Sequence, residues 1–349
     1  MSVTTLERPL LVLCALIALV SLSTLAFAAS AVSLRIRTRR AKARRARLEA
    51  EWEPLVLDIL AGELPVETLW IRVPANRAAW LIEYLLRVAR RLRGDDLEGL
   101  AAIAEPYLAL GLDRLHHRSA EQRAFAVETI NVLGRGRYKR EIATALDDRA
   151  PLVAMIAARA LTHEGEPEYL EAVIDRLHRF ETWSPRLLAS LLASIGPSAG
   201  PVLRRALADR ERPLRVRTLA ATALKQLNVL EAADDAVEVL ESENDRELLA
   251  SALRLLSKVG RPEQAATVRK LCRAEDFVVR AHALTALARL GSSDDAEVLR
   301  DALGDESSWV AIHAATGLKE AGHLTLLRNL AGSEDPRAEL ARQVLSDVA

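Results

Sequence analysis

The sequence predicts an all-α solenoid preceded by a single transmembrane helix, and three observations support this fold class. First, a glycine, once replaced by asparagine, recurs every 31 or 32 residues through the carboxyl-terminal two thirds of the chain. Second, an aliphatic residue stands four positions before each of these residues, and a small or aliphatic residue stands eight positions before it. Third, 26 consecutive residues between Arg8 and Arg35 carry no charge.

The uncharged run is the first predicted element. Residues 1–8 form a short tail, and residues 9–34 form the predicted transmembrane helix, with Leu10–Leu34 as its apolar part. A helix of that length measures about 39 Å, which exceeds the roughly 30 Å hydrocarbon core of a bilayer. A cleaved signal peptide is the alternative, because Ala26-Phe-Ala28 resembles a small-x-small cleavage site.

Residues 35–51 are expected to form a basic helix next to the span. Residues 35–47 contain eight basic side chains and no acidic one. Basic residues this close to a span hold their side of the membrane in the cytoplasm, and they also attract anionic lipid head groups. This favours a retained anchor, and it predicts an inner-membrane protein with a cytoplasmic carboxyl-terminal body. The membrane-orienting residues are Arg35, Arg37, Arg39, Arg40, Lys42, Arg44, Arg45 and Arg47.

Residues 52–112 do not follow the repeat period and are expected to form an irregular helical cap. Helical spacing of apolar residues predicts one helix from Asn76 to Arg93 and a second at about 96–110. Terminal units of a solenoid usually cover its exposed apolar end. Trp52 and Trp70 leave a second interpretation open, a partner-docking module close to the membrane.

Residues 113–349 contain the repeat. Steps of four residues place the apolar positions on one face of an α-helix, and Gly or Asn suits the left-handed conformation after a helix. Each unit is therefore predicted to be two stacked helices joined by a tight turn, with Pro336–Val348 as a closing helix. The turn residues are Gly134, Gly165, Gly196, Asn228, Gly260, Gly291 and Gly322. Four positions earlier stand Ile130, Leu161, Leu192, Leu224, Leu256, Leu287 and Leu318; eight positions earlier stand Ala126, Ala157, Leu188, Ala220, Ala252, Ala283 and Ala314.

The stretch from Asp276 to Gly291 carries an acidic residue, Val-Arg, small residues, and then Ala-Leu and Gly. This pattern resembles short HEAT repeats of the phycobilisome-lyase-like type, and the resemblance covers roughly residues 113–349. Two units depart from it: one has Leu152-Val153-Ala154 where Val-Arg is expected, and the unit at 184–196 keeps only the later positions. Such repeats serve adaptors, lyases, hydroxylases and glycosylases alike, so the resemblance implies a fold and leaves the function open.

The charge distribution argues against nucleic-acid binding. The chain has 48 basic and 48 acidic side chains, of which nine basic and one acidic lie in residues 1–47. The remaining body thus has 39 basic and 47 acidic residues, a net charge of −8, whereas a nucleic-acid groove is basic. Cys14 and Cys272 supply neither a disulfide framework nor a metal-spaced pair.

Two histidines occupy the same position, nine residues before the turn glycine, in consecutive repeats. Because helices of adjacent repeats pack about 8–10 Å apart, the rings of His282 and His313 are expected to approach each other. Packing between repeats is the favoured explanation for the shared position of the two histidines, ahead of partner contact and metal binding. Together with Arg280 and Trp309, they are the candidate partner-binding residues.

Three arginines stand eleven residues before a turn: Arg123, Arg217 and Arg280. They are expected on the more exposed flank of their helices. Asp276 precedes Arg280 by four residues, so a local ion pair within the helix is the expected partner.

No catalytic constellation is evident. His163-Glu164 is similar to the His-Glu pairs with which HEAT-like hydroxylases bind iron, but those proteins need several pairs and this chain has one. Ser198 lies in a Gly-x-Ser-x-Gly pattern that follows a predicted helix, whereas a hydrolase needs a strand there. No catalytic residue, metal, cofactor or small-molecule substrate is therefore expected.

The sequence predicts a non-catalytic, membrane-anchored scaffold whose concave surface binds a protein partner, an integral membrane enzyme complex, at the cytoplasmic face. By resemblance, anchored bacterial HEAT proteins of this layout are accessories to envelope machinery such as polysaccharide-synthesising glycosyltransferases. Two other classes stay open. A HEAT-like enzyme, bilin-lyase-like or metal-dependent hydroxylase-like, is one, although a lyase of that type would be expected without an anchor. A DNA-binding HEAT-like protein is the other, and it would need a basic groove.

Overall fold

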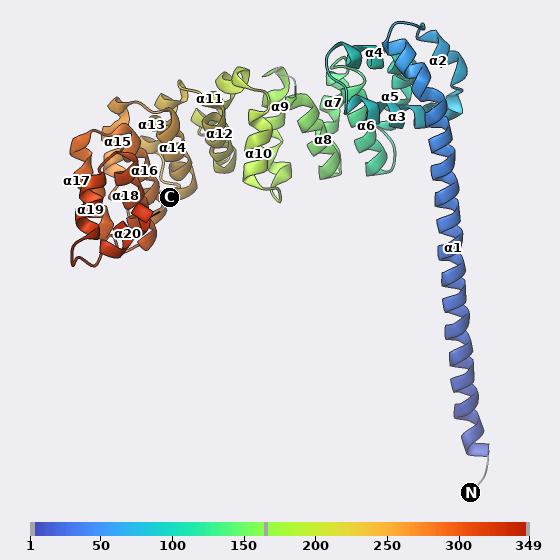
Figure 1. Ribbon diagram of the computed structural model, residues 1–349, viewed down its shortest axis with the longest axis horizontal. Coiled ribbons are helices and arrows are strands. Elements are labelled where there is room, and N and C mark those ends of the chain that lie inside the picture. Colours follow the sequence, from blue (N-terminus) through green and yellow to red (C-terminus); the bar gives the residue numbers. More distant parts are fainter. Residues whose placement is uncertain (1–3, 164–166, 347–349) are drawn as a thin grey trace. The chain divides into compact units, whose positions relative to one another are not determined.

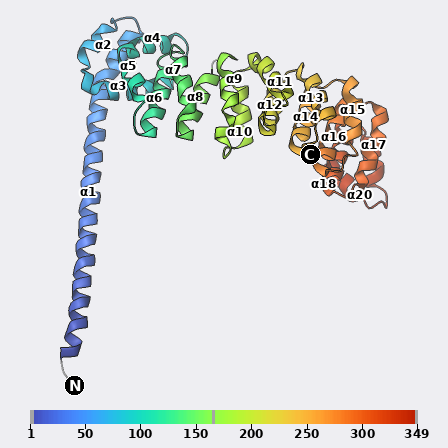
Figure 2. The same cartoon turned by 180° about the vertical axis from the view of Figure 1, so that it is seen from behind.

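The computed structural model describes residues 4–163 and 167–346, except for the side chains of residues 4–15, 17, 18, 20 and 95. Every regular element in these ranges is a helix, as the sequence predicts (Figures 1 and 2). The helices form two compact units. The first comprises Met1–Asp113 with Thr129–Arg137, and the second comprises Arg114–Glu128 with Tyr138–Ala349, so that α6 (Ala120–Val132) contributes to both.

The first unit begins with α1 (Thr4–Leu60), an uninterrupted helix of 57 residues. Its amino-terminal part extends away from the other helices of this unit (Figure 1), and its eight basic residues at 35–47 are exposed. Among the described residues, no single helix has both the length and the apolar composition of a membrane span. One pair of helices, Pro185–Ala193 and Pro197–Ala208, has that length and composition only when taken together, and the chain bends by 103° between them. In the predicted span, the side chains of residues 9–15, 17, 18 and 20 lie outside the described part.

The carboxyl-terminal end of α1 packs in the hydrophobic core of the first unit. Trp52 is 2% exposed, and its ring lies 6.2 Å from that of Tyr84. The indole nitrogen of Trp70 donates a hydrogen bond of 3.1 Å to the backbone carbonyl of Ile103. Trp52 is therefore a core residue and Trp70 is anchored, so neither is a free docking residue. The remaining helices of this unit are α2 (Glu67–Arg72), α3 (Ala78–Ala89), α4 (Asp95–Ala104) and α5 (Leu108–Arg114).

The second unit has two layers of helices, and each inner helix packs against the inner helix of the next repeat. The inner layer lies on the inside of this unit's curve and the outer layer on its outside (Figures 1 and 2). The inner helices are α8 (Pro151–Thr162), α10 (Pro185–Ala193), α12 (Leu214–Leu227), α14 (Arg246–Val259), α16 (Phe277–Leu290) and α18 (Ser308–Glu320). The outer helices are α7 (Lys139–Thr144), α9 (Leu170–Asp175), α11 (Gly200–Ala208), α13 (Ala232–Ser242), α15 (Ala265–Leu271), α17 (Ala296–Asp301) and α19 (Leu324–Ala331). The closing helix, α20 (Ala338–Ser346), packs on α18 and α19.

The periodic apolar positions form the buried spine of the repeats. All seven residues four positions before the turn residue, and all seven residues eight positions before it, have an exposed fraction of 0%. The predicted buried stripe is therefore confirmed at every repeat. Small side chains, such as Ala252 and Ala283, let consecutive inner helices approach closely, while Leu256 and Leu287 fill the space between the layers.

The turn residues use two different geometries. Asn228 has a φ of 53°, and Gly196 and Gly322 have φ values of 90° and 85°, in line with the prediction of a left-handed residue. Gly260 and Gly291, in contrast, have φ values of −70° and −72°, and Gly134 also lacks a positive φ, so the prediction is wrong at these three positions. Gly165 lies outside the described residues. Glycine is needed at positions 260 and 291 because of close contacts. A Cβ on Gly291 would lie 2.6 Å from the carbonyl oxygen of Leu287 and 2.6 Å from the carboxylate of Asp295.

Replacing Gly291 by alanine should therefore destabilise the protein through a steric clash, by about 1–3 kcal/mol, as for other overpacked sites. Gly332→Ala is the matched control, because its Cβ would meet no atom closer than 3.6 Å. We expect that control to be neutral or stabilising by about 0.4–1 kcal/mol. Urea unfolding of the detergent-solubilised full chain measures both, and equal effects would contradict the close-contact explanation.

Candidate functional site

A strip of half-buried polar side chains runs across the inner faces of α14, α16 and α18. Residues nine and six positions before the turn lie three apart in the helix, so they share one face. Repeating that face on neighbouring helices brings side chains distant in sequence together. We call this set the inner strip; its members are Ser251, Arg254, His282, Thr285, Trp309 and His313.

Arg254 and His282 connect α14 to α16 within the inner strip. The Nη1 atom of Arg254 lies 3.2 Å from Nε2 of His282. Because a guanidinium can only donate, the Nε2 atom accepts this hydrogen bond, which places the proton of a neutral His282 on Nδ1. The Nη2 atom of Arg254 donates to the hydroxyl of Ser251 at 2.7 Å. Arg254 thus has neutral partners only in these contacts.

His313 continues the strip from α16 to α18. Its Nδ1 atom lies 2.8 Å from the hydroxyl of Thr285. Because that hydroxyl donates its single proton to the backbone carbonyl of Ala281 at 3.1 Å, it accepts a hydrogen bond from Nδ1–H of His313. The rings of His282 and His313 have centroids 5.8 Å apart in an edge-to-face arrangement, so the predicted approach of the two rings is confirmed. Trp309 packs against His313 at 4.8 Å and keeps 49% of its surface exposed.

The environment of the strip keeps its imidazoles neutral. Burial lowers the pKa of His282 to about 4, and the nearby charges of Arg254, His313 and Lys225 act in the same direction. Burial also lowers the pKa of His313 and that of Arg254. Within residues 4–163 and 167–346, no group of three or more His, Cys, Asp or Glu side chains is arranged to hold a metal ion.

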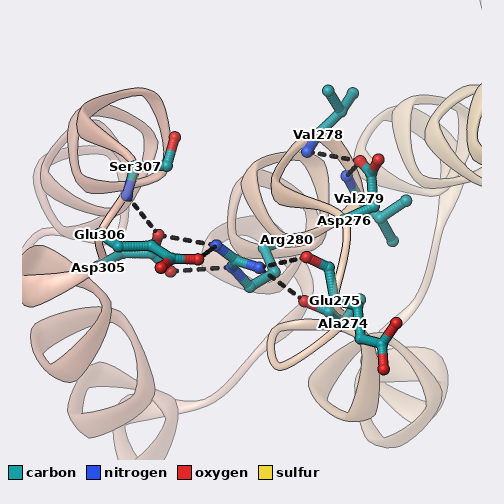
Figure 3. Close-up of polar contacts among 9 residues, drawn as sticks. All are labelled: Ala274, Glu275, Asp276, Val278, Val279, Arg280, Asp305, Glu306 and Ser307. Atoms are coloured by element: carbon teal, nitrogen blue, oxygen red, sulfur yellow. Dashed lines mark hydrogen bonds and ion pairs between the residues drawn. The ribbon is translucent and has the colours of Figure 1, made fainter.

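Arg280, the fourth predicted partner-binding residue, has a different surrounding (Figure 3). It is 9% exposed, and its Nε and Nη2 atoms each donate to a carboxylate oxygen of Asp305 at 2.9 Å. Its Nη1 atom donates to the backbone carbonyls of Ala274 and Glu275 at 2.9 and 2.8 Å. One guanidinium therefore joins the loop before α16 to the loop before α18.

The expectation that Arg280 is exposed and paired with Asp276 is wrong. Asp276 caps its own helix by accepting from the backbone N–H groups of Val278 and Val279, at 2.8 and 3.2 Å. Such a cap satisfies donors that the first helical turn leaves open. With Asp276 engaged in this way, Arg280 reaches across to the next repeat, and it is a structural residue.

The two other arginines that stand eleven residues before a turn make the same kind of contact. We call it the inter-repeat clamp: a buried arginine that donates to an acid of the next repeat and to backbone carbonyls. Arg123 is 5% exposed and donates to both carboxylate oxygens of Asp148, at 2.6 and 2.8 Å. Arg217 is 2% exposed and donates to Glu243 at 2.6 Å and to the carbonyl of Leu207 at 2.9 Å. In each case the acid follows the arginine by 25 or 26 residues, which is the sequence signal for the clamp.

The remaining predicted residues are not members of the inner strip. The eight basic residues of α1 are exposed; Arg45 pairs with Glu83 at 2.8 Å, and Arg44 lies 5.2 Å from the ring centroid of Trp80. His163 is exposed, whereas Glu164 lies outside the described residues. The sequence interpretation missed Arg254 and Thr285, although both stand three residues after the histidine position of their repeats.

Comparisons with known proteins agree with this architecture. A family model of HEAT repeats matches residues 233–319, which include α14, α16 and the inner strip. No curated protein sequence matches the chain. The second unit is thus a helical solenoid in which residues 233–319 match HEAT repeats, an architecture consistent with a protein-interaction scaffold.

Among solved structures, similar chains are the karyopherin Kap121p and human deoxyhypusine hydroxylase. Kap121p bound to the extreme C-terminus of the phosphatase Cdc14p is 13% identical, with a TM-score of 0.39, over 78% of this chain and 42% of that chain. The hydroxylase in complex with glycerol is 16% identical, with a TM-score of 0.32, over 79% of this chain and 97% of that chain. The chain spans less than half the length of Kap121p.

Removing the Arg280 clamp should destabilise the solenoid. Arg280→Ala leaves the half-buried carboxylate of Asp305 and two loop carbonyls without their donor. Breaking a fully buried pair costs about 3–5 kcal/mol, so we expect a loss of up to about 3 kcal/mol for this half-buried one. The control is Arg300→Ala, whose contact with Glu297 is a partly exposed pair of 3.6 Å and should change stability by no more than about 1 kcal/mol. Urea unfolding compares the two variants; similar small effects would show that the clamp is dispensable.

The low pKa of His282 predicts a specific loss of stability in acid. The imidazole has an ordinary pKa of 6.5 when unfolded and about 4 when folded, so the unfolded chain binds the proton more readily. The stability that neutral His282 contributes is complete above pH 6.5 and is lost as the pH falls toward 4. His282→Gln, which cannot titrate, should therefore lose less thermal stability than the wild type between pH 7 and 5. Equal losses of thermal stability in the variant and the wild type would contradict a lowered pKa of His282.

Proposed function

We propose that this protein is a membrane-tethered scaffold that binds a protein partner on the inner face of its solenoid. The observation that carries the proposal is the inner strip, a connected set of polar and aromatic side chains most of which keep part of their surface exposed. Within it, Arg254 bonds to a hydroxyl and an imidazole, and among the described residues it has no carboxylate within ion-pair distance. Clamps such as Arg280 already stabilise the repeats, so the strip is available for recognition. The solenoid supplies the extended curved surface that such binding uses.

Exposed apolar side chains on the helices of the strip support a protein as the occupant. Trp309, a member of the strip, is 49% exposed, and Phe277 and Ile312 on α16 and α18 are 45% and 40% exposed. Trp and Arg are enriched among the binding hot spots between proteins, and the inner strip contains both Trp309 and Arg254. A nucleic acid suits the surface less, because the body outside residues 1–47 has a net charge of −8.

The proposed membrane anchor is supported by the amino-terminal sequence. The 26 uncharged residues between Arg8 and Arg35 are followed by eight basic residues, and these are exposed on α1. This pattern supports a single-pass anchor in a bacterial inner membrane with a cytoplasmic solenoid. The partner that fits this position is an integral membrane enzyme complex, such as one for polysaccharide synthesis. A HEAT-like enzyme of the bilin-lyase-like or hydroxylase-like kind is the second candidate, and turnover lost without loss of binding would identify it.

A photoreactive amino acid placed on the inner face should capture the partner, whereas one on the outer face should not. Suitable inner positions are Thr222 and Thr316, six residues before their turns, and suitable outer positions are Lys270 and Glu297, which are exposed on α15 and α17. Cross-linking in cells followed by mass spectrometry should yield one common protein from both inner positions. The same protein from the outer positions, or different proteins from the two inner ones, would contradict the proposal.

The topology is tested with an alkaline-phosphatase fusion at the carboxyl terminus, which is active only in the periplasm. We expect an inactive fusion that stays in the membrane fraction after a carbonate wash, because the basic segment holds the solenoid in the cytoplasm. Changing all eight basic residues at 35–47 to Gln should raise the activity. An active wild-type fusion would show the opposite orientation, and release by carbonate would exclude a spanning anchor.

A further inference from the structure

Four basic side chains converge beside the inner strip. Lys225 stands on α12, Arg254 and Lys258 on α14, and Arg289 on α16. Arg254 and Lys258 are four residues apart on α14, which packs between α12 and α16, and the Nη1 atom of Arg289 lies 3.5 Å from the backbone carbonyl of Ser257, next to Lys258. In line with this placement, burial lowers the pKa of Lys225, and the charges of Arg254, Arg289 and Lys258 lower it further. We call this set the inner basic cluster.

Among the described residues, two carboxylates act on the cluster: that of Glu320, and that of Glu247, whose charge opposes the lowering of the pKa of Arg254 by burial. Arg289 has one, since its Nε atom lies 3.0 Å from the carboxylate of Glu320. Across the described ranges, Lys225, Arg254 and Lys258 make no ion pair within 4.0 Å. Elsewhere in the second unit, half-buried arginines such as Arg204 are paired, in that case with Asp235 at 2.5 Å. The inner basic cluster is therefore a local excess of positive charge on an acidic body.

Helix dipoles account for only part of this arrangement. A basic residue in the last turn of a helix is stabilised by the dipole, which explains Lys225, Lys258 and Arg289 individually. Arg254 lies six residues before Gly260, outside the last turn of α14, and its pKa is lowered by burial. The charge of Glu247 offsets part of this burial, and a half-buried guanidinium gains further stabilisation where an anion joins it.

We infer that the inner basic cluster binds the carboxylates of an acidic peptide segment of the partner. This inference rests on the proposed scaffold function and names the chemistry of its occupant. Carboxylate oxygens match the donor geometry of Arg254 and also reach the ammonium groups of Lys225 and Lys258. The exposed rings of Phe277 and Trp309 on the adjoining helices accept apolar residues of the same segment. An extended acidic segment can lie along α12, α14 and α16, because these helices are consecutive in the inner layer.

The test uses the detergent-solubilised full chain and a defined probe, a peptide of eight glutamates that carries a benzophenone group and a fluorophore. Binding is followed by fluorescence anisotropy, and the attachment site is mapped by mass spectrometry after irradiation. Mapping is needed because the eight basic residues of α1 also attract the probe. The variant is Lys225→Gln, Arg254→Gln and Lys258→Gln together, and the control changes three exposed basic residues of the outer layer, Lys270, Arg273 and Arg300, to Gln.

Cross-links of the wild type should map to α12–α18, and the variant should lose them and bind at least about tenfold more weakly at this site, as expected for lost hydrogen bonds to charged groups. The outer control should keep both. If Arg254→Gln impairs folding by circular dichroism, the double variant Lys225→Gln and Lys258→Gln serves instead. Cross-links confined to residues 35–47, or equal losses in the control, would overturn the inference.

The inference and the proposed function fail in distinguishable ways. If photoreactive groups at Thr222 and Thr316 still capture the cellular partner in the triple variant, the scaffold function stands and the acidic segment is wrong. If the inner positions capture no protein at all while the glutamate peptide binds at α12–α18, the cluster is an anion site and the scaffold proposal fails.

Discussion

The close packing of consecutive inner helices is the constraint on which the rest of the second unit depends. Small side chains such as Ala252 and Ala283 have no exposed surface, and a Cβ on Gly317 would lie only 3.0 Å from that of Ala288. Helices that approach this closely leave little freedom in register, because interiors pack at crystal-like density. The inner strip is a consequence of this packing, since His282 and His313 meet at 5.8 Å only if α16 and α18 keep their spacing.

Arginines at two different positions of the repeat have different roles. Arg123, Arg217 and Arg280 are buried, bonded to an acid of the next repeat and to loop carbonyls, and they stabilise the stack. Arg254 is half-buried and bonded to a hydroxyl and a neutral imidazole. Because the clamps lie at the beginning of the inner helices, the middle and end of these helices remain free to present the inner strip and the inner basic cluster.

The sequence predicts the parts of this fold that repeat. Positions four and eight before each turn are buried because a fixed period requires the same environment in every unit. Individual geometry is not predictable in this way: Gly260 and Gly291 have negative φ values and are needed because of contacts formed only in the folded chain. The exposure of Arg280 was mispredicted because its partner Asp305 lies 25 residues away, whereas local spacing suggested Asp276. Arg254 matched no motif, and only stacking places it beside His282.

A rigid inner surface on a membrane-tethered solenoid is the central claim of this account. The most direct measurement is an electron cryomicroscopy structure of the full chain in detergent with the partner captured by the inner-face cross-link. The account predicts partner density along α12, α14, α16 and α18, in contact with Trp309 and the inner basic cluster, while the repeats keep their stacking. Partner density confined to the outer helices or to residues 52–112 would contradict it.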